Sequence, residues 1–203
     1  QENQGQGAAR NYGLKHIKGK YVMFVDSDDI IHKNILKDLL SAIIEENADI
    51  AMANIQKFFH KDEIRCEGSI SKGKVYNCDF YDKFVCENNW TNHVIVSKLY
   101  NKELLEGVKF PEYRAIEDEF FLSKIYSKVT SIVYLNEIRY YYRQTNISTM
   151  RGGFNANRSL IVKALLERAL ICENMKKYKL AVIVKGQCLL ECMSWWSTFS
   201  QKK

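Results

Sequence analysis

The sequence predicts an α/β fold in which parallel strands alternate with helices. Residues 21–25 are a run of β-branched, aromatic and other apolar side chains, which is typical of a buried parallel strand. Apolar residues at helical spacing follow over residues 35–44, and a second apolar run covers residues 49–55. A strand, a helix and a strand in this order predict a parallel pair joined by a right-handed crossover.

The composition fits one globular domain, because 203 residues are 46% hydrophobic and 27% charged. The formal net charge of +6 favours anionic partners such as nucleotide phosphates or an anionic membrane surface. No Lys/Arg-rich stripe with interleaved aromatic residues appears, so we expect no nucleic-acid partner. No CxxC pair occurs, which argues against a zinc site. No secretory signal or membrane-length apolar run is visible, so we expect a cytoplasmic protein.

The first elements follow from apolar periodicity and from the residues that end each segment. A helix is expected over residues 7–17 and is closed by Gly19. The strand at 20–25 comes next, and then a helix that starts near Ile35 and ends near Asn47.

The rest of the chain is polar and mixed over residues 60–92, where Asp79 is expected to cap a short helix. The elements expected after it are a strand at 93–100, a helix at 117–129, strands at 131–135 and 138–143, a polar loop at 144–153, and two helices from 154 and over 180–199. The sequence shows no internal repeat and has a single proline, Pro111, so it marks no clear domain boundary.

Three carboxylates, Asp26, Asp28 and Asp29, directly follow the first strand. Ligands of open α/β sheets bind at the carboxyl ends of the strands, so these side chains lie where an active site is expected. They repel one another, and their hard oxygen atoms suit Mg²⁺ or Mn²⁺, which commonly serve phosphate chemistry. The alternative is that Asp28 and Asp29 favour the N-terminus of the next helix through its dipole.

Several motifs in a fixed order resemble those of the family-two glycosyltransferases of the GT-A fold. They are Ala9-Arg10-Asn11 within residues 4–14, Gly19-Lys20-Tyr21, the DXD-containing run Phe24-Val25-Asp26-Ser27-Asp28-Asp29, residues 97–105, Phe110-Pro111, Glu117-Asp118-Glu119-Phe120-Phe121 and Tyr140-Tyr141-Tyr142-Arg143. The resemblance covers about residues 5–150. Within the family, the motifs look most like those of bacterial enzymes of capsule, exopolysaccharide or lipopolysaccharide assembly.

The resemblance implies a GT-A, Rossmann-like fold with a mixed, mostly parallel sheet flanked by helices. Family members begin with strands that carry a P-x-Y-N-like and a D-D-G-S-like segment for the nucleotide, and neither segment occurs here. We therefore expect residues 1–153 to form a partial GT-A domain that lacks its N-terminal strands. Residues 154–203 are expected to form a helical extension packed on it.

The resemblance also implies a reaction: transfer of a sugar from a nucleotide-diphosphate donor, by default a UDP-sugar, to a hydroxyl of a saccharide or lipid-linked acceptor, with inversion. Asp28 is then the main metal ligand, and Asp26 holds the donor ribose or a metal-bound water. Inversion needs a base, and the family position of Asp118 assigns it that role, with Glu117 as its neighbour. Two acids that merely solvate a helix start are the alternative.

The roles of three further polar residues stay open. Arg143 either pairs with the donor phosphates or makes a surface ion pair. Arg10 and Asn11 either line the nucleotide pocket or fix their own helix. Trp90 could stack on a sugar, but it is more often a core residue, and His93 has no partner visible in the sequence.

The C-terminal segment carries Trp195, Trp196 and Phe199 among lysines, which suits a membrane interface. A helix that docks on the core is the alternative, because Leu180, Ile183, Leu189 and Leu190 need a partner.

Two other functional interpretations remain. The chain could be a catalytically incomplete piece of such a transferase. Its Asp26-Ser27-Asp28 run also comes close to the motif of DxD-type phosphohydrolases, in which the first Asp is a nucleophile.

Overall fold

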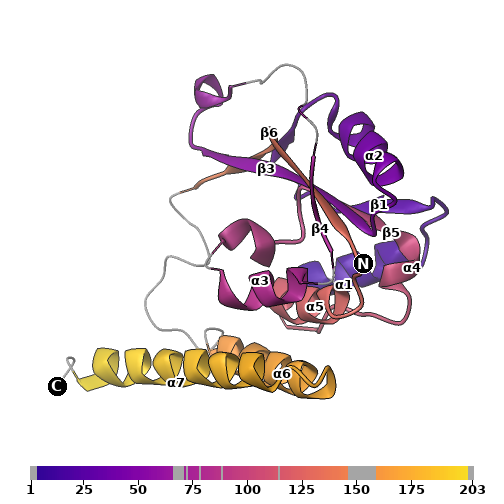
Figure 1. Cartoon of the computed structure of the whole chain (residues 1–203). Helices are drawn as coiled ribbons and strands as arrows, with labels where there is room; N and C mark the ends of the chain where they lie inside the picture. The colour runs from indigo at the N-terminus through magenta and orange to yellow at the C-terminus, as the bar shows by residue number, and fades with distance from the viewer. Residues whose placement is uncertain are drawn as a thin grey trace.

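A computed structural model of the chain describes residues 4–65, 71, 73–77, 79–87, 89–113, 115–145 and 159–200. One sheet runs through the molecule, with helix α2 (Ile35–Glu45) on one face and helices α1 (Gln6–Leu14), α3 (Phe80–Cys86) and α5 (Glu117–Tyr126) on the other side (Figure 1). A long helical hairpin forms a further layer beside α3 and α5. Most of the expected loop at 144–153 and the helical start at 154–158 lie outside the described residues.

The sheet is mixed. Its strands are β1 (Tyr21–Met23), β2 (Ile30–Ile31), β3 (Ile50–Phe58), β4 (Lys74–Tyr76), β5 (Lys98–Asn101) and β6 (Ile132–Arg143). They lie in the order β1-β5-β3-β6-β2, and β4 also pairs with β6. This confirms the α/β class and a mixed sheet flanked by helices.

The expectation that the sheet is mostly parallel is wrong. Among the described strands, β3 and β6 form the one parallel pair, and the other four pairings are antiparallel. The predicted parallel pair β1–β3 is not hydrogen-bonded, because β5 lies between the two strands and is antiparallel to both. Apolar runs indicate burial but do not say which later strand inserts between two earlier ones.

The helices largely match the predicted segments. Helix α1 ends at Leu14 and α2 at Glu45, each earlier than expected, and Asn47 follows α2 with a left-handed φ of 46°. The short helix α4 (Lys102–Leu105) was not predicted. The hairpin consists of α6 (Ser159–Asn174) and α7 (Tyr178–Ser200).

Two predicted strands need correction. Residues 131–135 and 138–143 belong to the single strand β6, whose register against β3 jumps from Leu135 to Ile138, so Asn136 and Glu137 form an irregularity. The strand predicted at 93–100 begins only at Lys98, because a 3-10 turn, η2 (Trp90–His93), precedes it.

The core lies on both faces of β3 and β6. Residues Ile50, Ala51 and Met52 of β3 are at most 1% exposed. Helix α2 covers them with Ile35, Leu39 and Ile43. The other apolar positions of α2, namely Leu36, Leu40 and Ile44, face solvent, although their helical spacing had grouped them with the core residues.

Candidate active site

The acidic segment after β1 is anchored by an aromatic cluster. Phe24 makes edge-on contacts with Tyr100, Phe110 and Phe121, with ring centroids 5.6–5.9 Å apart. Such contacts fix a side chain more strictly than area burial alone. The chain is therefore held in a fixed position two residues before Asp26.

Asp29 attaches the acidic segment to β6. Its carboxylate accepts hydrogen bonds from the Tyr140 hydroxyl at 2.6 Å and from the Arg143 backbone N–H at 2.8 Å. The Asp26 backbone N–H in turn donates to the Tyr140 oxygen at 3.2 Å. Burial raises the pKa of Asp29, and the two hydrogen bonds oppose that effect. The role of Asp29 is to hold the loop in place.

Asp28 is exposed, and its carboxylate makes no hydrogen bond or ion pair with another described residue. Its backbone carbonyl accepts a 2.7 Å hydrogen bond from Arg143 Nε. Helix α2 begins only at Ile35, so neither Asp28 nor Asp29 lies in its first turn. The helix-dipole interpretation of these two residues is therefore wrong.

Arg10 of α1 is the centre of the site. Its NH1 group lies 2.9 Å from Glu117 Oε1 and 3.0 Å from Asp118 Oδ1, and its NH2 group lies 2.9 Å from Asp26 Oδ1. The side chain is 11% exposed. Burial alone would lower the pKa of Arg10, but the three carboxylates outweigh it and raise that pKa. One guanidinium thus joins the end of β1 to the start of α5.

Asp118 has the properties of a base. Its Oδ1 is held by Arg10, and its Oδ2 accepts a 3.3 Å hydrogen bond from the Ile95 backbone N–H. Burial raises the pKa of Asp118 to about 6, with Arg10 opposing and the charge of Glu117 adding to the rise. Glu117 is 7% exposed and pairs with the same Arg10 nitrogen. Both acids face the interior of the site rather than simply solvating a helix start.

The loop that holds Asp118 from the other side is fixed by a buried lysine. Lys98 is 1% exposed, and its ammonium donates to the carbonyl oxygens of Thr91, Val94 and Val96. Burial lowers the pKa of Lys98 to about 7, and the nearby Asp118 charge opposes that shift. Three carbonyls on one cation keep the loop in the shape that presents the Ile95 N–H to Asp118.

Asn11 does not face the acidic residues. Its side-chain amide donates to the Phe110 carbonyl and accepts from the Phe110 N–H, both at 2.9 Å. Gly7, one turn earlier, has no room for a side chain, because a Cβ would lie 2.7 Å from the Pro111 carbonyl oxygen. These contacts support the second of the two roles considered for Asn11, which is to fix α1 against the Phe110-Pro111 segment.

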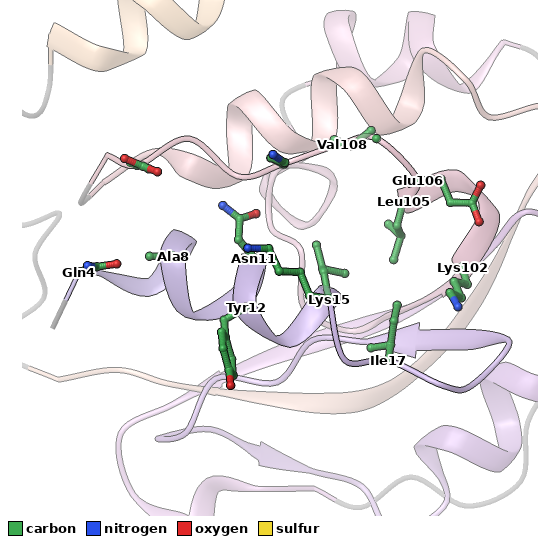
Figure 2. A pocket seen from close by; sticks show the side chains of 14 residues that line it. Gln4, Ala8, Asn11, Tyr12, Lys15, Ile17, Lys102, Leu105, Glu106 and Val108 are labelled. Atoms are coloured by element: carbon green, nitrogen blue, oxygen red, sulfur yellow. The ribbon is translucent and has the colours of Figure 1, made fainter. Parts of the chain in front are cut away.

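Two hollows of similar size flank α1. One, of about 400 Å³, lies between α1 and the segment around α4, with Asn11, Tyr12 and Lys102 among its lining residues (Figure 2). Its lining includes none of Asp26, Asp28, Glu117 and Asp118. The other, of about 420 Å³, is lined by the acidic and basic groups that matter here: Arg10, Asp26, Asp28, His93, Glu117, Asp118, Glu119 and Arg143. We take this second hollow, the acidic cavity, as the candidate active site.

Arg143 lines the acidic cavity. Its Nε donates to the Asp28 carbonyl, and its guanidinium carbon lies 5.1 Å from the centroid of the Phe58 ring. Arg143 is therefore placed beside Asp28, where it can meet an anionic ligand.

Trp90, for which a core position was the alternative, is half-buried, and Lys57 Nζ lies 4.1 Å from the centroid of its ring.

His93 has a partner that sequence reasoning missed. Its Nδ1 lies 3.0 Å from Glu119 Oε1, and Glu119 also pairs with Arg168 of α6. Glu119 directly follows the Glu117-Asp118 pair in the sequence, which was the one signal available. The partners are 26 and 49 residues away from Glu119, so no local pattern reveals them.

The donor set suits a divalent ion that shares its coordination with a substrate. No three His, Cys, Asp or Glu side chains converge as a complete metal set anywhere in the described part of the chain. Mg²⁺ typically binds through one or two carboxylates together with waters and substrate phosphates, so a complete protein cage is not required. Asp28, with its uncommitted carboxylate, fits this requirement, and Asp26 follows if it exchanges part of its contact with Arg10.

The comparisons with known proteins agree with this fold. Residues 1–108 match the family model described as glycosyl transferase family 2. Glycosyltransferase GlyA of Streptococcus pneumoniae is 32% identical over 86% of the chain, and TarS of Staphylococcus aureus, a poly(ribitol-phosphate) β-N-acetylglucosaminyltransferase, is 31% identical over 68%. A crystal structure of S. aureus TarS 1-349 in complex with UDP-GlcNAc covers 84% of the chain with a TM-score of 0.66 at 24% identity, which shows the fold.

The mixed sheet flanked by helices and its match to the TarS structure define a domain of the GT-A type. More particularly, the chain belongs to glycosyl transferase family 2, as the family match over more than half of its residues shows. The chain spans only part of its curated relatives, namely 26% of GlyA and 23% of TarS, and 48% of the TarS chain in the crystal structure. The division into residues 1–153 and 154–203 stays a prediction.

Proposed function

We propose that this chain carries the catalytic residues of an inverting glycosyltransferase that moves a sugar from a UDP-sugar to a hydroxyl of a saccharide or lipid-linked acceptor in surface-polysaccharide synthesis. The observation that carries the proposal is the acidic cavity, in which Arg10 brings Asp26 and Asp118 to opposite ends of one guanidinium. The activity for which TarS is named and the UDP-GlcNAc in its crystal structure support a UDP-sugar donor and a hydroxyl acceptor.

On the donor side, Asp28 and Asp26 would hold Mn²⁺ or Mg²⁺, which neutralises negative charge on a leaving diphosphate when it is bound. Arg143 lies on the same side, since its side chain donates to the Asp28 carbonyl, and a guanidinium can pair with phosphate oxygens in a bidentate manner. Arg10 touches Asp26 but is committed to three carboxylates, so its role is to orient the acids rather than to bind the nucleotide.

On the acceptor side, Asp118 acts as the base. The acceptor oxygen attacks the anomeric carbon as the bond from that carbon to the diphosphate oxygen breaks, and Asp118 takes the proton that the hydroxyl loses. Burial makes Asp118 a stronger base than an ordinary carboxylate, and the contacts with Arg10 and the Ile95 N–H keep it oriented. No observation favours the phosphohydrolase interpretation, which would need Asp26 as a nucleophile although it is paired with Arg10.

The metal and donor roles are tested by calorimetric titration of UDP with Mn²⁺ into the chain. Asp28→Ala is expected to weaken Mn²⁺-dependent UDP binding by more than about tenfold, or about 1.4 kcal/mol, because it removes a cavity carboxylate that has no hydrogen-bond or ion-pair partner among the described residues. Asp62→Ala, which changes an exposed carboxylate of the 3-10 turn at Lys61–Glu63, is the matched control and should bind normally.

Equal UDP binding by Asp28→Ala and wild type, or binding that persists after chelation of Mn²⁺, would contradict the assignment of Asp28. Absence of binding in the wild-type chain would support the alternative that this stretch lacks part of the donor site.

The hairpin supports a second part of the proposal, contact with an anionic membrane surface. Helix α7 packs on the domain through Leu180, Ala181, Val184 and Cys188, as the docking alternative predicts. Three residues that this alternative expected to be packed are exposed instead: Ile183, Leu189 and Leu190. One face of α7 carries an exposed apolar stripe, which consists of Tyr178, Val182, Leu189, Met193 and Trp196. Lys176, Lys179 and Lys185 accompany this stripe, a combination that favours anionic lipid headgroups.

None of the helices in the described ranges is both long and apolar enough to cross a membrane. The side chain of Phe199 and the lysines at 202–203 lie outside the described residues.

Flotation with vesicles that contain phosphatidylglycerol tests the membrane contact. Wild type is expected to float with the vesicles at low salt, and Leu189→Glu should lower the partition coefficient by about tenfold, since a buried Leu contributes about 1.5–3 kcal/mol. Leu36→Glu, on the exposed side of α2, is a control at a similarly exposed leucine. Wild type that stays with the unbound protein, or that binds neutral vesicles equally well, would contradict an anionic-membrane role.

A further inference from the structure

Three polar side chains from three separate elements form a row that starts in the acidic cavity and ends in the interior. His93 of η2 and Glu119 of α5 line the acidic cavity, and together with Arg168 of α6 they also line a neighbouring hollow of about 250 Å³. His93 Nδ1 lies 3.0 and 3.1 Å from the two Glu119 oxygens, and Glu119 Oε2 pairs with an Arg168 nitrogen. Arg168 also donates from Nε to the Ser123 hydroxyl at 3.0 Å and is 3% exposed.

The row is held rigidly. The Phe84 ring contacts both ends, with its centroid 4.8 Å from that of His93 and 4.3 Å from the Arg168 guanidinium carbon. The backbone carbonyls of the two residues before His93 accept hydrogen bonds from buried side chains. Lys98 Nζ donates to the Thr91 carbonyl at 2.7 Å, and the Tyr126 hydroxyl donates to the Asn92 carbonyl at 3.1 Å. His93 is therefore preorganised, which is unusual for a side chain that keeps 24% of its surface exposed in a cavity.

The contacts select one tautomer of His93. Burial disfavours the Glu119 carboxylate, but the hydrogen bonds and charges of His93 and Arg168 outweigh it and lower the pKa of Glu119. An ionised carboxylate only accepts hydrogen bonds, so it places the imidazole proton on Nδ1. In the neutral imidazole Nε2 then carries a lone pair, and it has no hydrogen-bond partner among the described residues.

We propose that His93 forms an acceptor subsite, in which Nε2 accepts a hydrogen bond from a hydroxyl of a sugar or polyol acceptor while Asp118 deprotonates the neighbouring hydroxyl. The inference rests on the proposed glycosyl transfer and adds a second contact to the acceptor. Ile95, whose N–H holds Asp118, is only two residues after His93, so one short loop sets the position of both groups. Adjacent hydroxyls are the feature that sugars and polyols share, and two fixed acceptor atoms can read such a pair.

The same geometry makes the helical hairpin part of the active site. Arg168 reaches Glu119 from α6, and Ile161 of the same helix lines the acidic cavity. Arg168 is thus a positioning residue that acts through Glu119 on His93.

The first test measures the His93 tautomer by long-range proton–nitrogen correlation spectra of the imidazoles at alkaline pH. The chain has four histidines, and His93→Gln identifies the signals of His93. The proposal expects the proton on Nδ1 in wild type and a mixture of tautomers in Arg168→Met. Lys124→Met, which removes the exposed α5–α6 ion pair with Glu167, should leave the tautomer unchanged. A proton on Nε2 in the wild type overturns the proposal.

The second test compares His93→Asn with His93→Gln. Asn keeps an amide near the Nδ1 position and can still donate to Glu119, whereas Gln places an acceptor oxygen near the Nε2 position. With UDP-GlcNAc as donor and ribitol 5-phosphate as the acceptor probe, His93→Asn should lose about tenfold in kcat/KM for the acceptor, the effect of one lost hydrogen bond. His93→Gln should lose less, and both should bind UDP normally. A purely structural role predicts the reverse order, which would overturn the proposal.

Failure of the subsite and failure of the proposed function can be told apart. If the wild-type chain neither binds UDP nor transfers sugar, that result counts against the proposed function alone. The subsite is then decided by titrating ribitol 5-phosphate and methyl glucoside into wild type while the imidazole spectra are recorded. Movement of the His93 Nε2 signal supports the subsite, and an unmoved Nε2 signal with both probes overturns it.

Discussion

Asp118→Asn is expected to lower the rate of sugar transfer by about 10²–10⁴-fold, the range typical of a general base, while UDP binding with Mn²⁺ stays unchanged. The amide keeps the size of Asp118 and can still accept the hydrogen bond from the Ile95 N–H, so the loop should keep its position. What the variant loses is the negative charge, and with it the basicity, that lets the carboxylate take the acceptor proton. The measurement is steady-state transfer with UDP-GlcNAc, alongside the UDP titration.

The control for this variant is Asp62→Asn, which removes an exposed carboxylate far along the chain from the motif and should transfer normally. Transfer by Asp118→Asn within a few fold of wild type would remove Asp118 from the mechanism. A parallel loss of UDP binding would instead indicate that Asp118 acts on the donor side.

The pH dependence of transfer gives an independent check on Asp118. Burial raises its pKa to about 6, and the base must be ionised to accept a proton. Transfer should therefore be constant above this pH and fall about tenfold per pH unit below it, whereas an ordinary carboxylate would hold its activity down to about pH 4. Folding stability changes with pH in the opposite direction to transfer. Because the folded state favours the protonated acid, the contribution of Asp118 to folding stability decreases as the pH rises from about 4 to 6.

The parts of the site that sequence reasoning found share one property, which is that their neighbours in the chain explain their position. Asp26 and Asp28 follow an apolar run, and Glu117 and Asp118 open a helix, so both pairs are visible as local patterns, although the strand in that run, β1, is only partly buried and pairs antiparallel with β5. The α/β class follows in the same way from apolar runs. The order of the strands does not, because the insertion of β5 between β1 and β3 depends on pairing between distant segments.

The parts that were missed depend on contacts between residues far apart in sequence. The contacts from Arg10 to Glu117 and to Asp118 span 107 and 108 residues, and that from Arg168 to Glu119 spans 49. The motif placed Arg10 in the site, but a charge at a motif position does not say whether it meets a ligand or another side chain. The structure shows it among carboxylates, and this changes what its replacement should do.

Arg10→Met is expected to lower the free energy of unfolding by about 3–5 kcal/mol, because it leaves three buried or half-buried carboxylates without their shared cation. Met keeps much of the length and apolar contact of the arginine side chain, so the change isolates the charge. The measurement is urea unfolding at neutral pH. Lys124→Met removes an exposed ion pair between α5 and α6 and should cost only about 0.2–1 kcal/mol.

The same variant separates the two roles that the sequence left open for Arg10. An arginine that binds the nucleotide would, on removal, weaken UDP binding and leave stability near that of wild type, and this result would contradict the counter-ion role. A counter-ion acts on Asp118 as well: since the charge of Arg10 lowers the pKa of Asp118, its loss should raise that pKa further. The acid limb of the transfer profile should then move to higher pH in Arg10→Met. Lys124→Met should leave it in place, because Lys124 pairs with Glu167, whereas Arg10 contacts Asp118 and the other two carboxylates of the cluster.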